Sequence, residues 1–178
     1  MEGVLVEVLE RFAAGDAEAF ESLFRQHQGM VFRWIVRIVR NAAVAEELTV
    51  ETFWKMHLAR ARFDAKKGNF CGWMRRIATN AALDYLRRAR PEVELPEELP
   101  ARRTPVAAEQ NELRRLIFAA MGQLSPQVRA AVLLALVEEE PYEEVGKALG
   151  ISTAAAKLRV FRGVRVLRKE LTKVGVQA

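Results

Sequence analysis

The chain has few of the residues on which redox and metal chemistry depend. Cys71 is its one cysteine, so no internal disulfide can form and no cysteine-based metal site is expected. The two histidines, His27 and His57, stand apart in helical patterns, and their spacing assigns neither of them a catalytic partner. We therefore expect no cofactor, no metal and no enzymatic activity, with Cys71 as a small filler beside a core.

Long hydrophobic runs are also missing. No apolar stretch approaches the roughly 18 residues that a membrane span needs. The opening residues, Met-Glu-Gly-Val-Leu-Val-Glu-Val, lack the basic start and the small-residue cleavage site of a signal peptide. Together with the single cysteine, these absences predict a cytoplasmic protein without a membrane span.

No useful length of strand-like alternation occurs, and helical spacing of apolar residues runs through most of the sequence. The sequence therefore predicts an all-α fold. Four of the six prolines fall within residues 91–105, among several glutamates, and proline cannot continue a helix interior. This composition predicts a Pro/Glu-rich linker over residues 91–107, between two small helical domains at 1–90 and 108–178.

Positive charge is concentrated in two blocks. Residues 60–90 hold nine Lys/Arg against two Asp, and residues 153–178 hold seven Lys/Arg against one Glu. Residues 91–112, which lie between the blocks, hold six Glu against two Arg. This distribution predicts two surfaces that face a polyanion, although solvated helix faces would give the same pattern.

Capping residues predict where the helices of the first domain begin. Asp16 and Asn41 are suitable N-caps for two helices, and a third runs from Phe70 to about Arg90 after a loop. This third helix carries an apolar stripe and a polar stripe, which predict a buried face and a separate reading face. The apolar stripe is Phe70, Trp73, Ile77, Ala81 and Tyr85, and the polar stripe is Asn69, Arg76, Asn80 and Arg87.

Proline and glycine punctuate the second domain. After a first helix, Ser125 as N-cap and Pro126 at the first helical position predict the start of a helix that reaches about residue 138. Pro141 opens a short helix that Gly150 ends, and Ser152 caps a longer basic helix. A short helix, a tight turn and a longer basic helix together predict a helix-turn-helix.

Three blocks, AEELTVETF at 45–53, WMRRIATN at 73–80 and LDYLRR at 83–88, resemble segments of the extracytoplasmic-function (group IV) sigma factors of bacterial RNA polymerase. Residues 45–53, AEELTVETF, are similar to the family's helix that docks on the polymerase clamp. Residues 62–88, which include WMRRIATN and LDYLRR, resemble its segment for melting and reading the minus-ten element. The resemblance covers about residues 12–90 and 108–171, in the family's order.

The second domain supplies the other part of the resemblance. The sequences LSP at 124–126, YEEV at 142–145 and LGIS at 149–152 look like the family's minus-thirty-five domain. A helix-turn-helix of this kind also occurs in many ordinary regulators. The pairing of both regions across an acidic linker is the specific feature.

The resemblance implies a factor that binds core RNA polymerase and directs promoter recognition, promoter melting and transcription initiation. Polymerase contacts are expected from Glu47, Leu48, Glu51 and Trp54. Minus-ten DNA contacts, to duplex and melted single strand, are expected from Lys66, Lys67, Asn69, Phe70, Arg75, Arg76, Asn80, Arg87 and Arg88. Minus-thirty-five DNA contacts are expected from Ser152, Thr153, Lys157, Arg159, Arg162 and Arg165. An anti-sigma protein is a further partner that the family relationship allows.

Two segments depart from the family pattern. Residues 153–159 read TAAAKLR, where the family commonly has a glycine, a threonine, a valine and a serine around the lysine. Val50 stands where glutamine is usual. With fewer hydrogen-bonding side chains on its recognition helix, the second domain is expected to contribute affinity more than sequence discrimination.

Three other interpretations fit parts of the sequence. A regulator could use the carboxy-terminal helix-turn-helix alone, with the first domain as a sensor or dimeriser. A basic, helical RNA-binding protein would share the charge pattern. A small enzyme would need a site that the residue spacing does not reveal. Binding to core polymerase distinguishes the sigma factor from all three.

Overall fold

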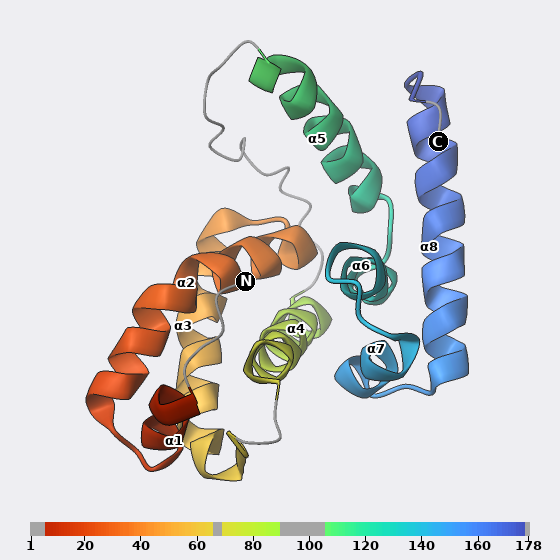
Figure 1. Ribbon diagram of the computed structural model, residues 1–178. Helices are drawn as coiled ribbons and strands as arrows, with labels where there is room; N and C mark the ends of the chain where they lie inside the picture. The colour runs from red at the N-terminus through yellow and green to blue at the C-terminus, as the bar shows by residue number, and fades with distance from the viewer. Residues whose placement is uncertain (1–5, 66–68, 90–105, 177–178) are drawn as a thin grey trace. The chain divides into compact units, whose positions relative to one another are not determined.

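The computed structural model describes residues 6–65, 69–89 and 106–176, with side chains described from residue 112 onward in the last range (Figure 1). Every regular element in these ranges is helical, which confirms the predicted all-α class. The chain divides into two compact units, Met1–Glu92 and Val93–Ala178. The domain limits 1–90 and 108–178 and the linker 91–107 remain a prediction, because residues 90–105 lie outside the described ranges.

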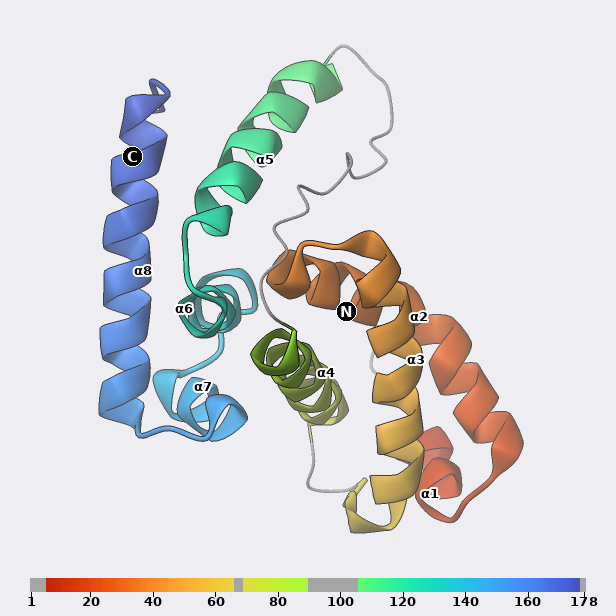
Figure 2. The ribbon, with the colours of Figure 1, turned by 180° about the vertical axis from the view of Figure 1, so that it is seen from behind.

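The first unit is a bundle of three long helices with a short helix beside it. These elements are α1 (Val6–Ala13), α2 (Ala17–Val39), α3 (Ala42–Ala59) and α4 (Phe70–Arg88), with a 3-10 turn, η1, over Arg60–Arg62. Helices α2, α3 and α4 pack against one another, and α1 packs on α2 (Figures 1 and 2). Deep in this bundle, Nε1 of Trp34 donates a hydrogen bond to Oγ1 of Thr79 over 2.9 Å.

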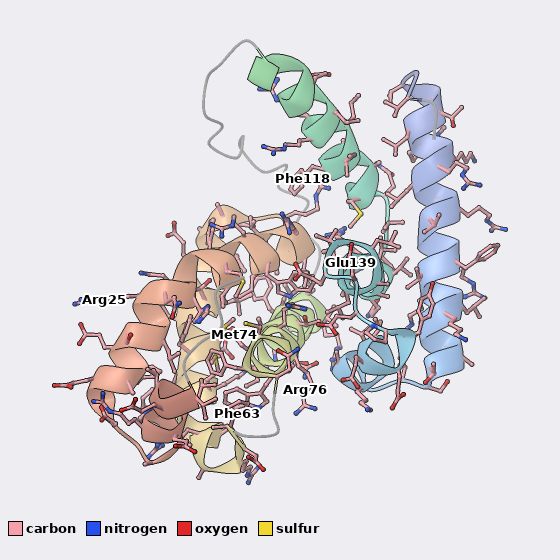
Figure 3. The ribbon with its side chains drawn as sticks, in the orientation of Figure 1. Arg25, Phe63, Met74, Arg76, Phe118 and Glu139 are labelled. Atoms are coloured by element: carbon pink, nitrogen blue, oxygen red, sulfur yellow. The ribbon has the colours of Figure 1, made fainter. Side chains whose placement is uncertain are left out.

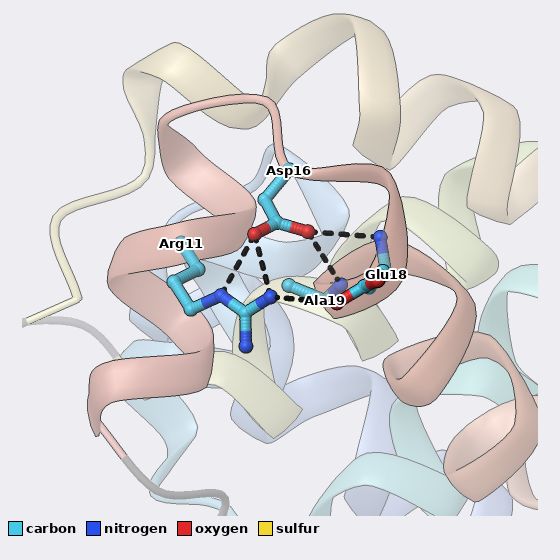
Figure 4. Close-up of polar contacts among 4 residues, drawn as sticks. All are labelled: Arg11, Asp16, Glu18 and Ala19. Atoms are coloured by element: carbon cyan, nitrogen blue, oxygen red, sulfur yellow. Dashed lines mark hydrogen bonds and ion pairs between the residues drawn. The ribbon is translucent and has the colours of Figure 1, made fainter.

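The predicted cap of α2 is present, and it is tied to the preceding helix. Oδ1 of Asp16 accepts from the backbone N–H groups of Glu18 and Ala19 at 2.8 and 3.0 Å (Figure 4). Nε of Arg11, on α1, donates to Oδ2 of the same carboxylate over 2.7 Å. The Ala19 N–H and the Arg11 guanidinium lower the pKa of Asp16, so the cap stays ionised. This arrangement fixes α1, which the sequence analysis missed, against the start of α2.

The buried side of α4 differs from the predicted one. Among the predicted apolar stripe, Phe70 and Ala81 are buried, but Trp73, Ile77 and Tyr85 are only half-buried. The four residues that α4 buries most, Met74, Ala78, Thr79 and Ala82, all lie outside the predicted stripe. The core therefore lies to one side of the predicted stripe. Figure 3 shows Met74 on the packed side of α4 and Arg76 projecting away from the helix.

The second unit contains α5 (Val106–Gly122), α6 (Pro126–Val132), α7 (Tyr142–Leu149) and α8 (Thr153–Lys173). The helix after Pro126 was expected to reach about residue 138, but α6 ends earlier and continues as a π-helical turn, η2 (Leu133–Val137). There the N–H of Glu138 bonds to the carbonyl of Leu133 over 3.2 Å, and Glu139 adopts a left-handed φ of 54°. Pro141 then opens α7, as predicted.

A buried arginine and a glycine hold the helices of this unit together. Arg129 on α6 donates to the carbonyls of Met121 and Leu124, each over 2.9 Å, and so binds the carboxyl end of α5. Gly163 on α8 lies so close to α6 that a Cβ there would meet Cγ2 of Val132 at 2.3 Å. Helix α8 can therefore pack directly on α6 only because this position lacks a side chain.

Candidate interfaces for polymerase and DNA

Helix α3 presents an exposed apolar stripe on the first unit. Val50, Trp54 and Leu58 follow one another at four-residue spacing and are 62%, 59% and 63% exposed. We call these three residues the α3 stripe. Glu47 and Glu51, both predicted polymerase contacts, are exposed beside it. A monomeric protein rarely leaves such large side chains in water along one helix face, so the stripe suits a protein partner.

The predicted polymerase contact Leu48 does not lie on this surface. Leu48 is buried in the core of the bundle, and its neighbours on the same face of α3 are also buried. Sequence reasoning instead missed Val50 and Leu58. Their spacing from Trp54, one turn on either side, was the available signal.

Ring contacts and an ion pair surround Trp54. Its indole stacks on the His57 ring, with centroids 5.8 Å apart and planes 18° apart. The His57 ring in turn meets Phe20 of α2 edge-on at 5.1 Å. Glu51 forms an ion pair with Lys55, one turn along, over 2.6 Å. The exposed indole therefore packs on the imidazole of His57, which in turn contacts the Phe20 ring of α2.

The polar stripe predicted on α4 is on the surface. Asn69, Arg76, Asn80 and Arg87 are all exposed, and so is Arg88. Asn69 is also the N-cap of α4, because its Oδ1 accepts from the Gly72 N–H over 3.0 Å. Two amides and three guanidinium groups can offer hydrogen bonds to bases and charge to phosphates. The predicted contacts Lys66 and Lys67 lie outside the described residues.

Two residues predicted to contact minus-ten DNA are in the core instead. Phe70 is buried, and its ring meets the rings of Phe63 at 5.6 Å and His27 at 5.6 Å. Arg75 is buried and has partners within the protein. Phe70 therefore belongs to a buried aromatic cluster at the start of α4 and offers no free ring face to a base.

His27 is the buried titratable group of this cluster. Its Nε2 has no hydrogen-bond partner, and burial lowers the pKa of the imidazole. In the part of the chain that the structure describes, no group of three or more His, Cys, Asp or Glu is suited to hold a metal. Among these same residues, no helix is long and apolar enough to cross a bilayer.

Helix α8 carries the predicted minus-thirty-five contacts. Ser152 caps it, with Oγ accepting from the Ala155 N–H over 3.2 Å. Thr153, Lys157, Arg162 and Arg165 are exposed, and Arg159 is half-buried. The ammonium of Lys157 lies over the Tyr142 ring of α7, 5.8 Å from its centroid. Two large apolar residues that the sequence analysis had not singled out for contact, Leu158 and Phe161, are also exposed on this helix.

Family models match both units. Sigma-70 region 2 matches residues 23–92, and Sigma-70, region 4 matches residues 114–167. The first match covers the three-helix bundle, and the second covers the helix-turn-helix. A regulator that used only a helix-turn-helix would not require the first match.

Relatives of known name extend the likeness over nearly the whole chain. RNA polymerase sigma factor CarQ of Myxococcus xanthus is 38% identical over an alignment of 173 residues, gaps included, which covers 95% of this chain and 98% of that protein. ECF RNA polymerase sigma factor SigE of Mycolicibacterium smegmatis is 36% identical over an alignment of 173 residues, gaps included, which covers 90% of this chain and 66% of that protein.

Solved structures share the fold. CnrH, in complex with the cytosolic domain of CnrY, superposes with a TM-score of 0.68 and 21% identity, over 94% of this chain and 97% of that one. The sigma factor RpoE, in complex with the anti-sigma factor NepR from Bartonella quintana, superposes with a TM-score of 0.68 and 17% identity. This match covers 88% of this chain and 98% of that one. From the family matches and the identity to CarQ, the chain belongs to the extracytoplasmic-function sigma factors, which direct promoter-specific initiation of transcription.

Proposed function

We propose that this sigma factor acts in the cytoplasm, without catalytic groups of its own, by dividing polymerase binding and promoter reading among three helices. Helix α3 binds core RNA polymerase, α4 holds the melted minus-ten strand, and α8 enters the duplex at the upstream element. The single observation that carries the proposal is the α3 stripe, three large apolar side chains exposed on one helix face beside Glu47 and Glu51.

The α3 stripe has the composition of an interface centre. Aromatic residues, tryptophan above all, are enriched among the residues that dominate binding energy. Trp54 is well suited, because its indole is exposed yet supported by the stack on His57. The flanking carboxylates of Glu47 and Glu51 would face basic groups of the partner and favour correct encounter. Leu48 is left out of the proposed contact because it is buried.

The α4 contacts are proposed to act on unpaired DNA. Asn69 and Asn80 present amides that can hydrogen-bond to a base edge, and Arg76, Arg87 and Arg88 present charge to phosphates. Lys66 and Lys67, which precede α4 in the sequence, are proposed to add phosphate contacts on the strength of the sequence alone. The basic, exposed face of α8 is proposed to bind duplex DNA through Thr153, Lys157, Arg159, Arg162 and Arg165.

Titration of core RNA polymerase with labelled sigma factor tests the proposal. Because removal of a central interface tryptophan typically costs 2 kcal/mol or more, we expect Trp54→Ala to weaken binding by at least about 30-fold. The double variant Glu47→Lys/Glu51→Lys should also weaken binding, with little change in melting temperature. The matched control is Glu21→Lys, which breaks a pair of the same four-residue spacing with Arg25 on α2. Unchanged binding by both α3 variants would remove the case for this face.

A further inference from the structure

The exposed face of α8 has an apolar centre. Ala154, Leu158 and Phe161 follow one another at spacings of four and three residues, so they lie along one line on the helix. Leu158 is 48% exposed and Phe161 is 66% exposed. The opposite face of α8 is buried through Ala156, Val160 and Gly163. We call Ala154, Leu158 and Phe161 the α8 ridge, and it is the part of the helix that points most directly away from the domain.

Basic side chains border the ridge. Lys157 lies on one side, where the Tyr142 ring holds its ammonium, and Arg162 lies on the other. Arg165 continues the line of the ridge by one turn. Helix α8 carries seven Lys/Arg against one acidic residue, Glu170, which is already paired with Lys173 over 2.7 Å. This charge selects a polyanion as the occupant and disfavours a basic protein surface.

In the major groove, the base edges expose one apolar group that an apolar side chain can pack against, the C5 methyl of thymine. Donors and acceptors distinguish the four base pairs there, and thymine alone among the unmodified bases adds a C5 methyl. The seven residue-to-residue steps from Ala154 to Phe161 rise by about 10 Å, which corresponds to roughly three base-pair steps. A ridge of this length can therefore meet the methyl groups of a short thymine-containing run.

We propose that the α8 ridge, and Leu158 in particular, reads thymine methyl groups in the upstream promoter element. This inference rests on the proposed role of α8 in duplex binding. It also changes the expectation from sequence, in which the loss of polar side chains from residues 153–159 left this helix with affinity and little discrimination. Recognition of methyl groups lets the helix discriminate between base pairs without hydrogen bonds. Lys157, Arg162 and Arg165 hold the helix in the groove by contacts with phosphates.

The test uses the full chain assembled with core polymerase. A promoter is first selected by this holoenzyme from duplexes that are randomised in both elements. Each thymine of its upstream element is then replaced by deoxyuridine, which removes the C5 methyl and leaves every hydrogen-bonding group in place. Affinity is measured by competition, and a DNase footprint records whether the upstream element is covered. Deoxyuridine outside the footprint is the control on the DNA.

We expect the selected upstream element to contain thymine, and deoxyuridine to weaken binding by about fourfold for each methyl group that is buried. Leu158→Ala should lose this sensitivity at one position, and Phe161→Ala at a neighbouring one. The control is Val174→Ala, which truncates a similarly exposed residue, 52% accessible, at the carboxyl end of α8. It should behave as the wild type.

Equal affinity for thymine and uracil duplexes, with the upstream footprint retained, would overturn the inference but leave the proposed DNA role of α8 intact. The inference would also fall if Leu158→Ala weakened core polymerase binding and left deoxyuridine sensitivity unchanged, because the ridge would then face protein. Loss of the upstream footprint on every duplex would overturn the proposed role of α8 together with the inference.

Discussion

At the scale of single residues, the imidazole of His27 is a polar group that the bundle buries without satisfying it. Its Nε2 lies in the core without a hydrogen-bond partner, and the Phe70 ring is 5.6 Å away. A neutral imidazole can be tolerated there, whereas an imidazolium would have to lose its hydration. Burial accordingly lowers the pKa of His27 in the folded protein.

His27 should therefore make stability depend on pH. The unfolded chain binds a proton near pH 6.5, and the folded chain binds it only at lower pH, so stability rises with pH between the two values. We expect this contribution to be complete above about pH 6.5 and to be lost as the pH falls through the depressed pKa. Urea unfolding from pH 8 to pH 5 measures it. In His27→Phe this part of the dependence should disappear; an identical slope in both proteins would assign it to other groups.

At the scale of elements, caps and glycines predicted helix ends well. Asp16, Asn41 and Ser152 each cap the helix that the sequence assigned to them, and Gly150 ends α7 with a φ of 64°. Ser125 stands at the predicted N-cap of α6, but its side chain accepts no capping hydrogen bond. These signals are local, because a side chain bonds its own helix terminus. The π-helical turn that shortens α6 has no such signal.

At Gly163, the close packing of α8 on α6 favours glycine, whereas helix propensity alone would favour alanine. Alanine is favoured over glycine in a helix interior by up to about 1 kcal/mol, but a Cβ here would meet Val132 at 2.3 Å and Val128 at 3.0 Å. We expect Gly163→Ala to destabilise the second unit by about 1–3 kcal/mol in chemical unfolding. Gly29→Ala on α2 is the matched control, since its Cβ would contact only the end of Arg33 at 3.4 Å. It should be neutral or stabilising. Equal effects of the two would mean that α6 and α8 can separate at no cost.

Helix α4 gives a prediction about promoter opening. Asn80 is exposed and does not cap a helix, so Asn80→Ala should remove a proposed base contact without unfolding the protein. Because that contact is made to an unpaired base, we expect permanganate reactivity of the bubble to fall several-fold while gel-shift binding of duplex DNA changes little. Asn69 needs a gentler change: Asn69→Asp keeps the capping oxygen. Equal losses in the two assays would instead assign Asn80 to duplex binding or to folding.

At the scale of the whole molecule, the sequence predicted the fold class and the family but not which stripe of each helix is covered. Helix α3 is apolar on two sides, one buried through Leu48 and Met56 and one exposed through Val50 and Trp54. Periodicity finds both stripes, and only the packing of α2 and α4 decides between them. For the same reason Phe70 and Arg75, on the loop side of α4, looked available for DNA and are buried.

The distribution of charge over both units predicts how promoter binding responds to salt. Each phosphate contact to duplex DNA adds about 0.9 to the slope of log affinity against log salt concentration, and each contact to a single strand adds about 0.7. We expect Lys157→Gln/Arg162→Gln to reduce the slope of log affinity against log salt concentration for the holoenzyme by about 1.8. Fluorescence anisotropy measured between about 50 and about 200 mM salt gives this slope. Arg87→Gln/Arg88→Gln should reduce it only on a premelted promoter. A slope unaffected by the α8 pair would show that these cations do not reach phosphates.

The three tryptophans occupy three different environments, and this has a spectroscopic consequence. Trp34 is buried and hydrogen-bonded to Thr79, Trp73 is half-buried among other rings, and Trp54 is exposed on the α3 stripe. An indole in water emits at longer wavelength than one in an apolar site. Trp54 is therefore an intrinsic fluorescent reporter of polymerase binding. Docking of α3 onto polymerase would dehydrate Trp54 and shift its emission maximum to shorter wavelength, while the emission maximum of the buried Trp34 would stay unchanged.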